Sequence, residues 1–200
     1  MILRNNTMVS NGYKPEAPSL RNNTRKKRMK IFAERSNGLI SEEFLNWLID
    51  NGFCEAPAST KHHGNYKGGL FDHCEIVAES LQRFTDELGL KWSRPESPLI
   101  IGLFHDLCKI DSYEPVWGMA GKVESYEYNT NSLLKGHGEK SIMLLSRFMT
   151  LTEEEILCIR YHMGAYETDN WEQYGQSMKK YETVLWTHTA DMYASKVCGV

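Results

Sequence analysis

The 200-residue sequence has no long hydrophobic run, and no stretch approaches the roughly 18–20 apolar residues that span a bilayer. Its first residues lack the charged, apolar and small-residue order of a signal peptide. The five cysteines are dispersed and form no CxxC pair, which argues against a zinc ribbon or a disulfide scaffold and favours reduced thiols. These absences predict a cytoplasmic protein that does not act at a membrane.

Positive charge is scarce outside the first 30 residues. Residues 1–30 hold eight basic side chains and one acidic side chain, whereas the whole chain has a net charge of −3. The basic segment is rich in Asn, Ser and Thr, which predicts a flexible basic N-terminal arm over residues 1–30. Residues 31–200 have the length of a single domain. The arm is either a nucleic-acid tether or a solvated tail, and the acidic remainder of the chain disfavours a nucleic-acid partner.

The spacing of apolar residues predicts a mainly α-helical domain. Ser41 precedes two glutamates as an N-cap would, and apolar residues recur at helical spacing from Leu70 to Leu88. Further helices are expected at residues 97–107, 138–149, 152–162 and 181–196. Residues 112–130 break this pattern and predict a short β-hairpin, whereas the polar and aromatic residues 164–180 predict a loop.

Six potential metal ligands lie on these expected helices or at their ends: His73, His105, Asp106, His137, His162 and Asp191. A helical bundle can bring such scattered side chains to one central site. A buried, unpaired Asp106 would be costly, whereas a cation would neutralise it. Imidazole suits Fe, Mn, Ni, Co and Zn, and carboxylate suits Mg and Mn, so we expect one or two divalent ions of unassigned identity.

These residues, in this order, resemble the HD-domain metal-dependent phosphohydrolase superfamily. The likeness covers roughly residues 40–196, and its motifs are His73, Phe104 to Lys109, His137, His162 and Asp191 with the flanking segments 56–73, 136–141 and 160–164. These flanks are similar to the HD domain of bacterial 3′–5′ exoribonucleases. Residues 1–40 cannot form the OB-fold barrel that precedes that domain, and Tyr161-His162 stands where those enzymes tend to have a His-His pair. A stand-alone HD hydrolase is therefore expected.

The resemblance implies an all-α HD-domain bundle that hydrolyses a nucleotide or another small phosphoester with a metal-activated water. It implies a first ion held by His73, His105, Asp106 and Asp191, and a second held by Asp106, His137 and His162. Two ions roughly 3.5–4 Å apart can clamp the attacking and leaving oxygens of a phosphoryl displacement. In the one-ion alternative, His137 and His162 position the substrate instead.

Several other side chains are candidates for catalysis or substrate binding. Lys109 lies one helical turn after the bridging Asp106 and can reach a phosphate oxygen. The glycine-bearing loop before His73 holds Lys61, His62 and His63, which would bind phosphate or protonate the leaving oxygen, with His63 as the expected catalytic group. Tyr166 and Trp171, in the expected loop over residues 164–180, would stack on a base. His188 is either a metal ligand, a donor to a ligand or a core histidine.

Two other classes of function stay open. The same ligands can hold a di-iron pair that activates O₂, as in oxygenases that resemble HD hydrolases, and O₂ uptake would distinguish that chemistry. A non-catalytic nucleotide-binding module is the third class, although such a module would be expected to lose some ligands. The sequence fixes neither the substrate nor the oligomeric state.

Overall fold

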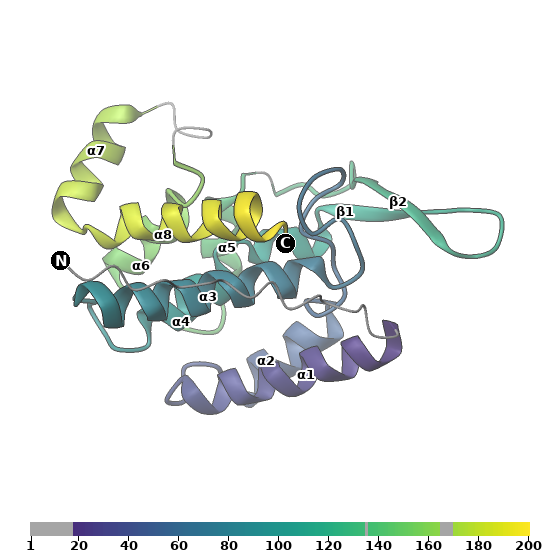
Figure 1. Cartoon of the computed structure of the whole chain (residues 1–200), viewed down its shortest axis with the longest axis horizontal. Helices are drawn as coiled ribbons and strands as arrows, with labels where there is room; N and C mark the ends of the chain where they lie inside the picture. The colour runs from purple at the N-terminus through teal and green to yellow at the C-terminus, as the bar shows by residue number, and fades with distance from the viewer. Residues whose placement is uncertain (1–17, 135, 165–169) are drawn as a thin grey trace, which may run out of the picture.

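The computed structural model describes residues 18–134, 136–164 and 170–200. It is mainly helical with one short two-stranded sheet, as the sequence predicts. Helix α3 (Gly69–Leu88) crosses the middle of the molecule and packs against α4 (Ser97–Phe104) and α8 (Thr183–Met192) (Figure 1). Within the described ranges, no helix is both long enough and apolar enough to cross a membrane.

The remaining helices lie on either side of α3, and a hairpin extends away from them (Figure 1). These elements are α1 (Pro18–Arg35), α2 (Glu42–Asp50), the 3₁₀ helix η1 (Leu107–Asp111), β1 (Tyr113–Trp117), β2 (Val123–Tyr128), α5 (Gly138–Leu145), α6 (Glu153–Arg160), α7 (Trp171–Lys180) and the π-helix η3 (Tyr193–Cys198). The Ser41 side chain caps α2 by accepting from the Phe44 N–H, and Thr152 and Glu155 form a capping box at α6. The antiparallel β1–β2 hairpin confirms the strand prediction.

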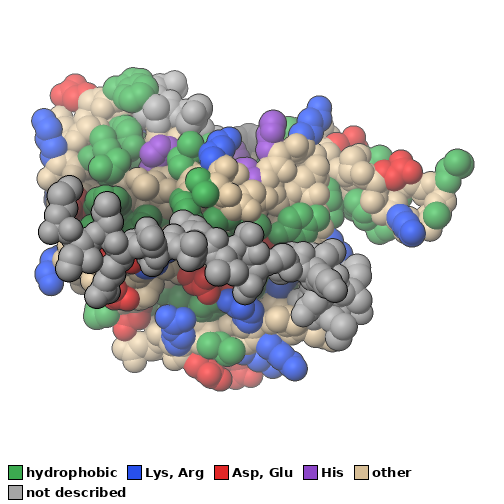
Figure 2. Space-filling model, in the orientation of Figure 1, with side chains coloured by type: hydrophobic (Ala, Val, Ile, Leu, Met, Phe, Trp, Pro, Cys, Tyr) green, Lys and Arg blue, Asp and Glu red, His purple; other side chains and the backbone are tan. Residues whose placement is uncertain are grey.

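Helix α1 occupies part of the segment expected to be a flexible arm. Its Arg25 is 5% exposed and forms two hydrogen bonds of 2.7 Å with the carboxylate of Asp72 on α3. Arg28 of α1 also pairs with Glu75 and Glu79 of α3. Residues 18–30 were predicted to belong to a flexible arm, but they form part of α1, whose Arg25 and Arg28 pair with acidic residues of α3. Figure 2 shows basic and acidic side chains close together over this part of the molecule. Residues 1–17 lie outside the described part of the chain.

Two further boundaries differ from the predictions. Helix α7 occupies most of the segment expected to be a loop, and the Asn170 side chain caps it by accepting from the Gln173 N–H. Helix α4 ends at Phe104, so the expected helix over residues 97–107 breaks at His105. Both differences have a local cause. The polar and aromatic composition of residues 171–180 is not typical of a helix, and the apolar residues of α4 continue to Leu107, beyond the end of the helix.

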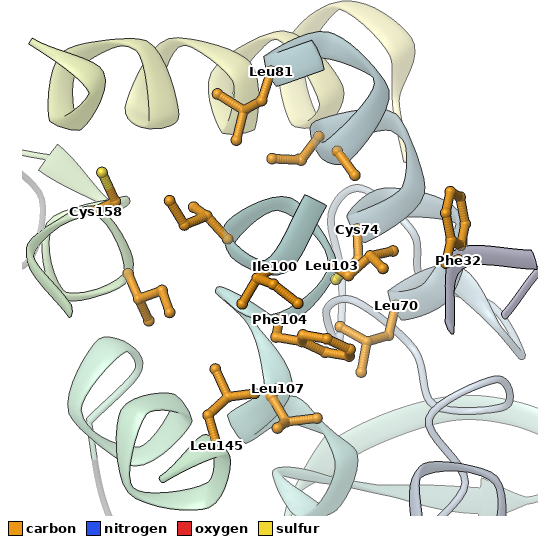
Figure 3. Close-up of a cluster of buried hydrophobic side chains, with 14 of the residues drawn as sticks. Phe32, Leu70, Cys74, Leu81, Ile100, Leu103, Phe104, Leu107, Leu145 and Cys158 are labelled. Carbon is orange, nitrogen blue, oxygen red and sulfur yellow. The ribbon is translucent and has the colours of Figure 1, made fainter. Parts of the chain in front are cut away.

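The hydrophobic core lies between α3, α4 and the helices that flank them (Figure 3). Its buried side chains include Phe32, Leu70, Cys74, Leu81, Ile100, Leu103, Phe104, Leu107, Leu145 and Cys158. Gly102 lets α4 approach α3 closely, because a Cβ on Gly102 would lie 2.3 Å from the Ala78 Cα. The residues that follow Phe104 are therefore held in the interior, next to the first turns of α3.

Candidate metal centre

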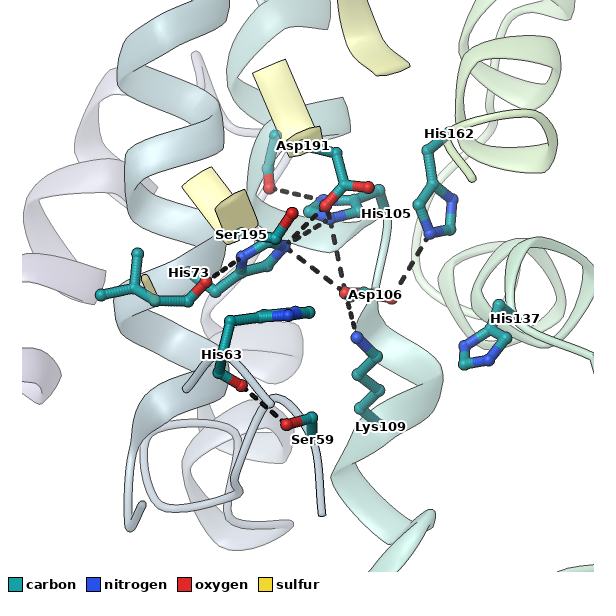
Figure 4. Close-up of polar contacts among 12 residues, drawn as sticks. Ser59, His63, His73, His105, Asp106, Lys109, His137, His162, Asp191 and Ser195 are labelled. Carbon is teal, nitrogen blue, oxygen red and sulfur yellow. Dashed lines mark hydrogen bonds and ion pairs between the residues drawn. The ribbon is translucent and has the colours of Figure 1, made fainter. Parts of the chain in front are cut away.

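Six elements or their ends carry the predicted ligands toward one region (Figure 4). His73 lies in the second turn of α3, and Asp191 lies near the end of α8. His105 and Asp106 occupy the turn between α4 and η1, rather than the interior of a helix. His137 precedes α5, and His162 follows α6 by two residues.

The first cluster consists of His73, His105 and Asp191, and all three side chains are buried. The two Nε2 atoms of His73 and His105 lie 3.2 Å apart, and His73 Nε2 lies 3.0 Å from Asp191 Oδ1. Asp106 Oδ2 lies 3.6 Å from His73 Nε2 and 3.5 Å from His105 Nε2. Four of the predicted ligands thus face a common point.

Asp106 also belongs to a second buried cluster, with His105 and His162. Its Oδ1 atom lies 3.4 Å from His162 Nε2, while its Oδ2 atom faces the first cluster. One carboxylate therefore lies between the two sets of imidazoles. The two oxygens of Asp106 thus face two groups of imidazoles that share His105.

His137 lies apart from His105 and His162. Its ligand atom groups with those of Asp106 and Cys108, all within 4.8 Å of one another. The contact between His137 Nδ1 and Cys108 Sγ is 3.8 Å. Sequence reasoning treated Cys108 only as a buried thiol, although its place two residues after Asp106 was a signal that it lies near the centre. Burial, with Asp106 adding to it, raises the pKa of Cys108 to about 12, so the thiol is neutral.

Backbone oxygens orient the three buried imidazoles. The Nδ1 atoms of His73, His105 and His162 lie 2.9, 3.0 and 2.7 Å from the carbonyl oxygens of Val200, Gly102 and Ile159, respectively. The tautomer that donates Nδ1–H to each carbonyl leaves Nε2 facing the centre with a free lone pair. Each ring is thereby fixed in direction, with its Nε2 atom facing the centre.

Burial and close charges set the pKa values of the ligands. Burial lowers the pKa of His105 to about 3, although Asp106 acts in the opposite sense, so the imidazole is neutral at pH 7. Burial alone would raise the pKa of Asp106, but Lys109 and His105 hold it well below its usual range. Burial would likewise raise the pKa of Asp191, but the adjacent His73 imidazole holds it well below its usual range. Asp106 and Asp191 therefore present anionic oxygens, and His105 presents a neutral nitrogen. Burial would lower the pKa of His162, but the Asp106 carboxylate raises it.

Lys109 and His63 also reach the centre (Figure 4). Lys109 is 6% exposed, and its Nζ lies 2.7 Å from Asp106 Oδ2. Burial alone would lower the pKa of Lys109, but Asp106 raises it above its usual value, so the ammonium stays charged. The His63 ring lies 5.1 Å from the His73 ring between centroids. Burial and the neighbouring His73 lower the pKa of His63 to about 4.

The other predicted substrate residues are not brought to the centre by the described contacts. Lys61 and His62 are exposed on the loop that carries His63. Trp171 begins α7 and is 61% exposed, with its ring against Tyr174. Tyr166 lies outside the described residues. Their assignment to substrate binding remains a prediction.

Sequence reasoning missed several residues that support the centre. The Ser59 hydroxyl donates to the His63 carbonyl at 2.8 Å and accepts from the His62 N–H, which fixes the loop. His188, for which the roles of ligand, donor and core histidine stayed open, contacts the His162 carbonyl through Nδ1 at 2.7 Å. His188 thus supports the backbone of a ligand rather than serving as one. No short motif marks these contacts, because they depend on the fold.

A divalent cation fits the donor set of this centre. Asp106 Oδ1 and His162 Nε2 are buried and face each other at 3.4 Å, and neither has another hydrogen-bond partner among the described residues, so an ion between them would satisfy both atoms. The cluster also buries two carboxylates, Asp106 and Asp191, of which Asp106 pairs with the Lys109 ammonium, and a cation would offset the remaining negative charge. Comparisons of the chain with protein-family models, with curated proteins and with solved structures found no match.

Proposed function

We propose that the chain is a metal-dependent phosphohydrolase of the HD-domain type, acting on a nucleotide or another small phosphoester. The observation that carries the proposal is the position of Asp106. Its two oxygens face two imidazole clusters that share His105, and the buried Oδ1 has no partner among the described residues besides His162 Nε2 at 3.4 Å. A carboxylate so placed is suited to bridge two ions.

The proposed first ion is held by His73, His105, Asp106 and Asp191, and the proposed second by Asp106, His162 and His137. When bound, a divalent ion supplies Lewis-acid chemistry, because it lowers the pKa of a water from about 15.7 toward ~7 and offsets charge on phosphate oxygens. The protein holds Nε2 of His73, His105 and His162 toward this position through the backbone bonds at their Nδ1 atoms.

Lys109 favours a phosphoester over other substrates. Its ammonium lies beside the bridging carboxylate, with hydrogen-bond capacity beyond the bond to Asp106. We propose that Lys109 binds a non-bridging phosphate oxygen and holds the phosphorus next to Asp106. An oxygenase that acts on a neutral polyol has no comparable use for this charge, whereas one that acts on a phosphonate does, so O₂ uptake with a phosphonate would separate the di-iron alternative from the hydrolase.

His63 is proposed to accept a proton rather than to donate one. With its pKa lowered to about 4, the imidazole is neutral at pH 7 and is poorly suited to protonate a leaving oxygen. Its Nε2 atom is buried without a hydrogen-bond partner among the described residues, so it can accept from a water at the centre. The loop contacts of Ser59 hold the ring in this position.

The proposal is tested by a screen of phosphomonoesters, cyclic nucleotides and dinucleotides with Mn²⁺, Fe²⁺, Co²⁺, Ni²⁺, Zn²⁺ or Mg²⁺, with product release followed by chromatography. We expect hydrolysis of at least one class and a loss of at least ~100-fold in Asp106→Asn. Asp111→Asn, which changes a nearby exposed carboxylate paired with Lys140, is the matched control and should retain activity. Activity of Asp106→Asn within about tenfold of the wild type would contradict the proposal, as would metal-dependent O₂ uptake without hydrolysis.

A further inference from the structure

Gly199 and Val200 contact the candidate centre from far along the chain. The backbone oxygen of Val200 lies 2.9 Å from His73 Nδ1, across 127 positions of sequence. The Gly199 carbonyl accepts from the Gly64 N–H at 3.4 Å. One short segment therefore reaches both a proposed ligand and the residue that follows His63.

The segment is held in place by its own turn. Gly199 ends η3 in the left-handed conformation, with a φ of +75°. The N–H groups of Gly199 and Val200 both donate to the Ala194 carbonyl, the latter at 3.2 Å. The Val200 side chain is half-buried and packs against the hydrophobic core. These contacts aim the Val200 oxygen at α3.

The loop on the other side is also closely fitted. Gly64 has a φ of +58°, and its carbonyl accepts from the Ala58 N–H at 3.0 Å. Its N–H donates to Gly199, which is the contact that joins the loop to the end of η3. A displacement of Gly199 would therefore affect the loop of His63 as well as the His73 ring.

We propose that Gly199–Val200 is a positioning segment that fixes the His73 imidazole for metal binding and holds the His63 loop against the centre. The inference rests on the proposed metal centre and deepens it. A ligand imidazole needs an acceptor at its second nitrogen to keep its tautomer and direction, and loss of such a partner typically weakens metal binding about 10–100-fold. Gly199–Val200 supplies that acceptor for His73.

Three variants of the full protein and one control test this role. Removal of residues 199–200 deletes the acceptor, and Gly199→Val strains the left-handed turn because a β-branched residue rarely adopts positive φ. Gly199→Asn is the conservative variant, because Asn tolerates this conformation and a Cβ there meets open space. Gly89→Val is the matched control: Gly89 also follows a helix with positive φ, +70°, and a Cβ there also meets open space.

Calorimetric titration with Mn²⁺ and Zn²⁺ measures metal affinity, and NMR of the metal-free protein detects the His73 Nδ1 proton. We expect the deletion and Gly199→Val to weaken binding about 10–100-fold and to lose the exchange-protected Nδ1 proton, whereas Gly199→Asn and Gly89→Val keep both. The proposal is overturned if the deletion variant binds metal within about threefold of the wild type and retains a protected Nδ1 proton. If the wild type binds no metal, the proposed function fails. Comparison of the His73 Nδ1 proton in the wild type and in the deletion variant still shows whether Gly199–Val200 holds the His73 ring.

Discussion

Replacement of Gly102 by Ala should show how closely α4 must approach α3. In an ordinary helix interior, Gly→Ala stabilises by about 1 kcal/mol through helix propensity. At Gly102 the added Cβ would lie 2.3 Å from the Cα and 2.5 Å from the N of Ala78, and both of these atoms are backbone. No side-chain rotation relieves such a contact, so one helix must move away from the other. Overpacking of this kind typically costs about 1–3 kcal/mol.

Gly175→Ala supplies the matched comparison. Gly175 lies within α7, and a Cβ there meets no atom within 4 Å, so only the propensity gain of about 1 kcal/mol is expected. Urea unfolding of both variants measures the two free energies of unfolding. We expect Gly102→Ala to be less stable than Gly175→Ala by about 1–3 kcal/mol, with an unchanged denaturant slope.

The same substitution reports on the centre. Gly102 supplies the carbonyl that accepts from His105 Nδ1 at 3.0 Å, and the α3–α4 approach sets the 3.2 Å separation between His73 and His105 Nε2. Gly102→Ala should therefore weaken metal binding, whereas Gly175→Ala should not. Equal stabilisation by the two alanines would refute the argument that this close approach builds the site.

Two ion pairs give further predictions, each measured by chemical unfolding. Arg25→Ala removes two hydrogen bonds to Asp72 and should lower the free energy of unfolding by about 1.5–3 kcal/mol. Limited proteolysis should then cut within α1 first, and a wild-type pattern would contradict its docking on α3. Glu155 is fully buried, and its carboxylate accepts hydrogen bonds from Arg94, the Ser97 hydroxyl and the Thr152 N–H. Glu155→Gln removes this charge and should lower the free energy of unfolding by about 3–5 kcal/mol. A loss below about 1 kcal/mol would show that the pairing contributes little.

Sequence patterns located the proposed ligands more reliably than the residues that hold those ligands in place. The order of His73, His105, Asp106, His162 and Asp191 predicted that they would meet, and the structure brings them together. Local rules also placed the caps at Ser41 and Thr152, because a capping side chain bonds within three residues of itself.

The features that sequence reasoning missed depend on contacts between residues that are distant in the sequence. The Val200 oxygen and the His188 ring reach ligands that are distant in sequence, and no local spacing specifies either contact. Helix α1 was missed for a similar reason, because Arg25 pairs with Asp72 on another element. Composition alone cannot separate a solvated basic segment from a basic helix with acidic partners.

The central claim is that Asp106 and the surrounding imidazoles hold divalent metal. Elemental analysis by plasma mass spectrometry of protein expressed with added metals tests it most directly, with Asp106→Asn and Asp111→Asn measured alongside. We expect about one to two equivalents of transition metal in the wild type and in Asp111→Asn, and a clear loss in Asp106→Asn. Less than about 0.2 equivalents in the wild type, or the same metal content in all three proteins, would contradict the account.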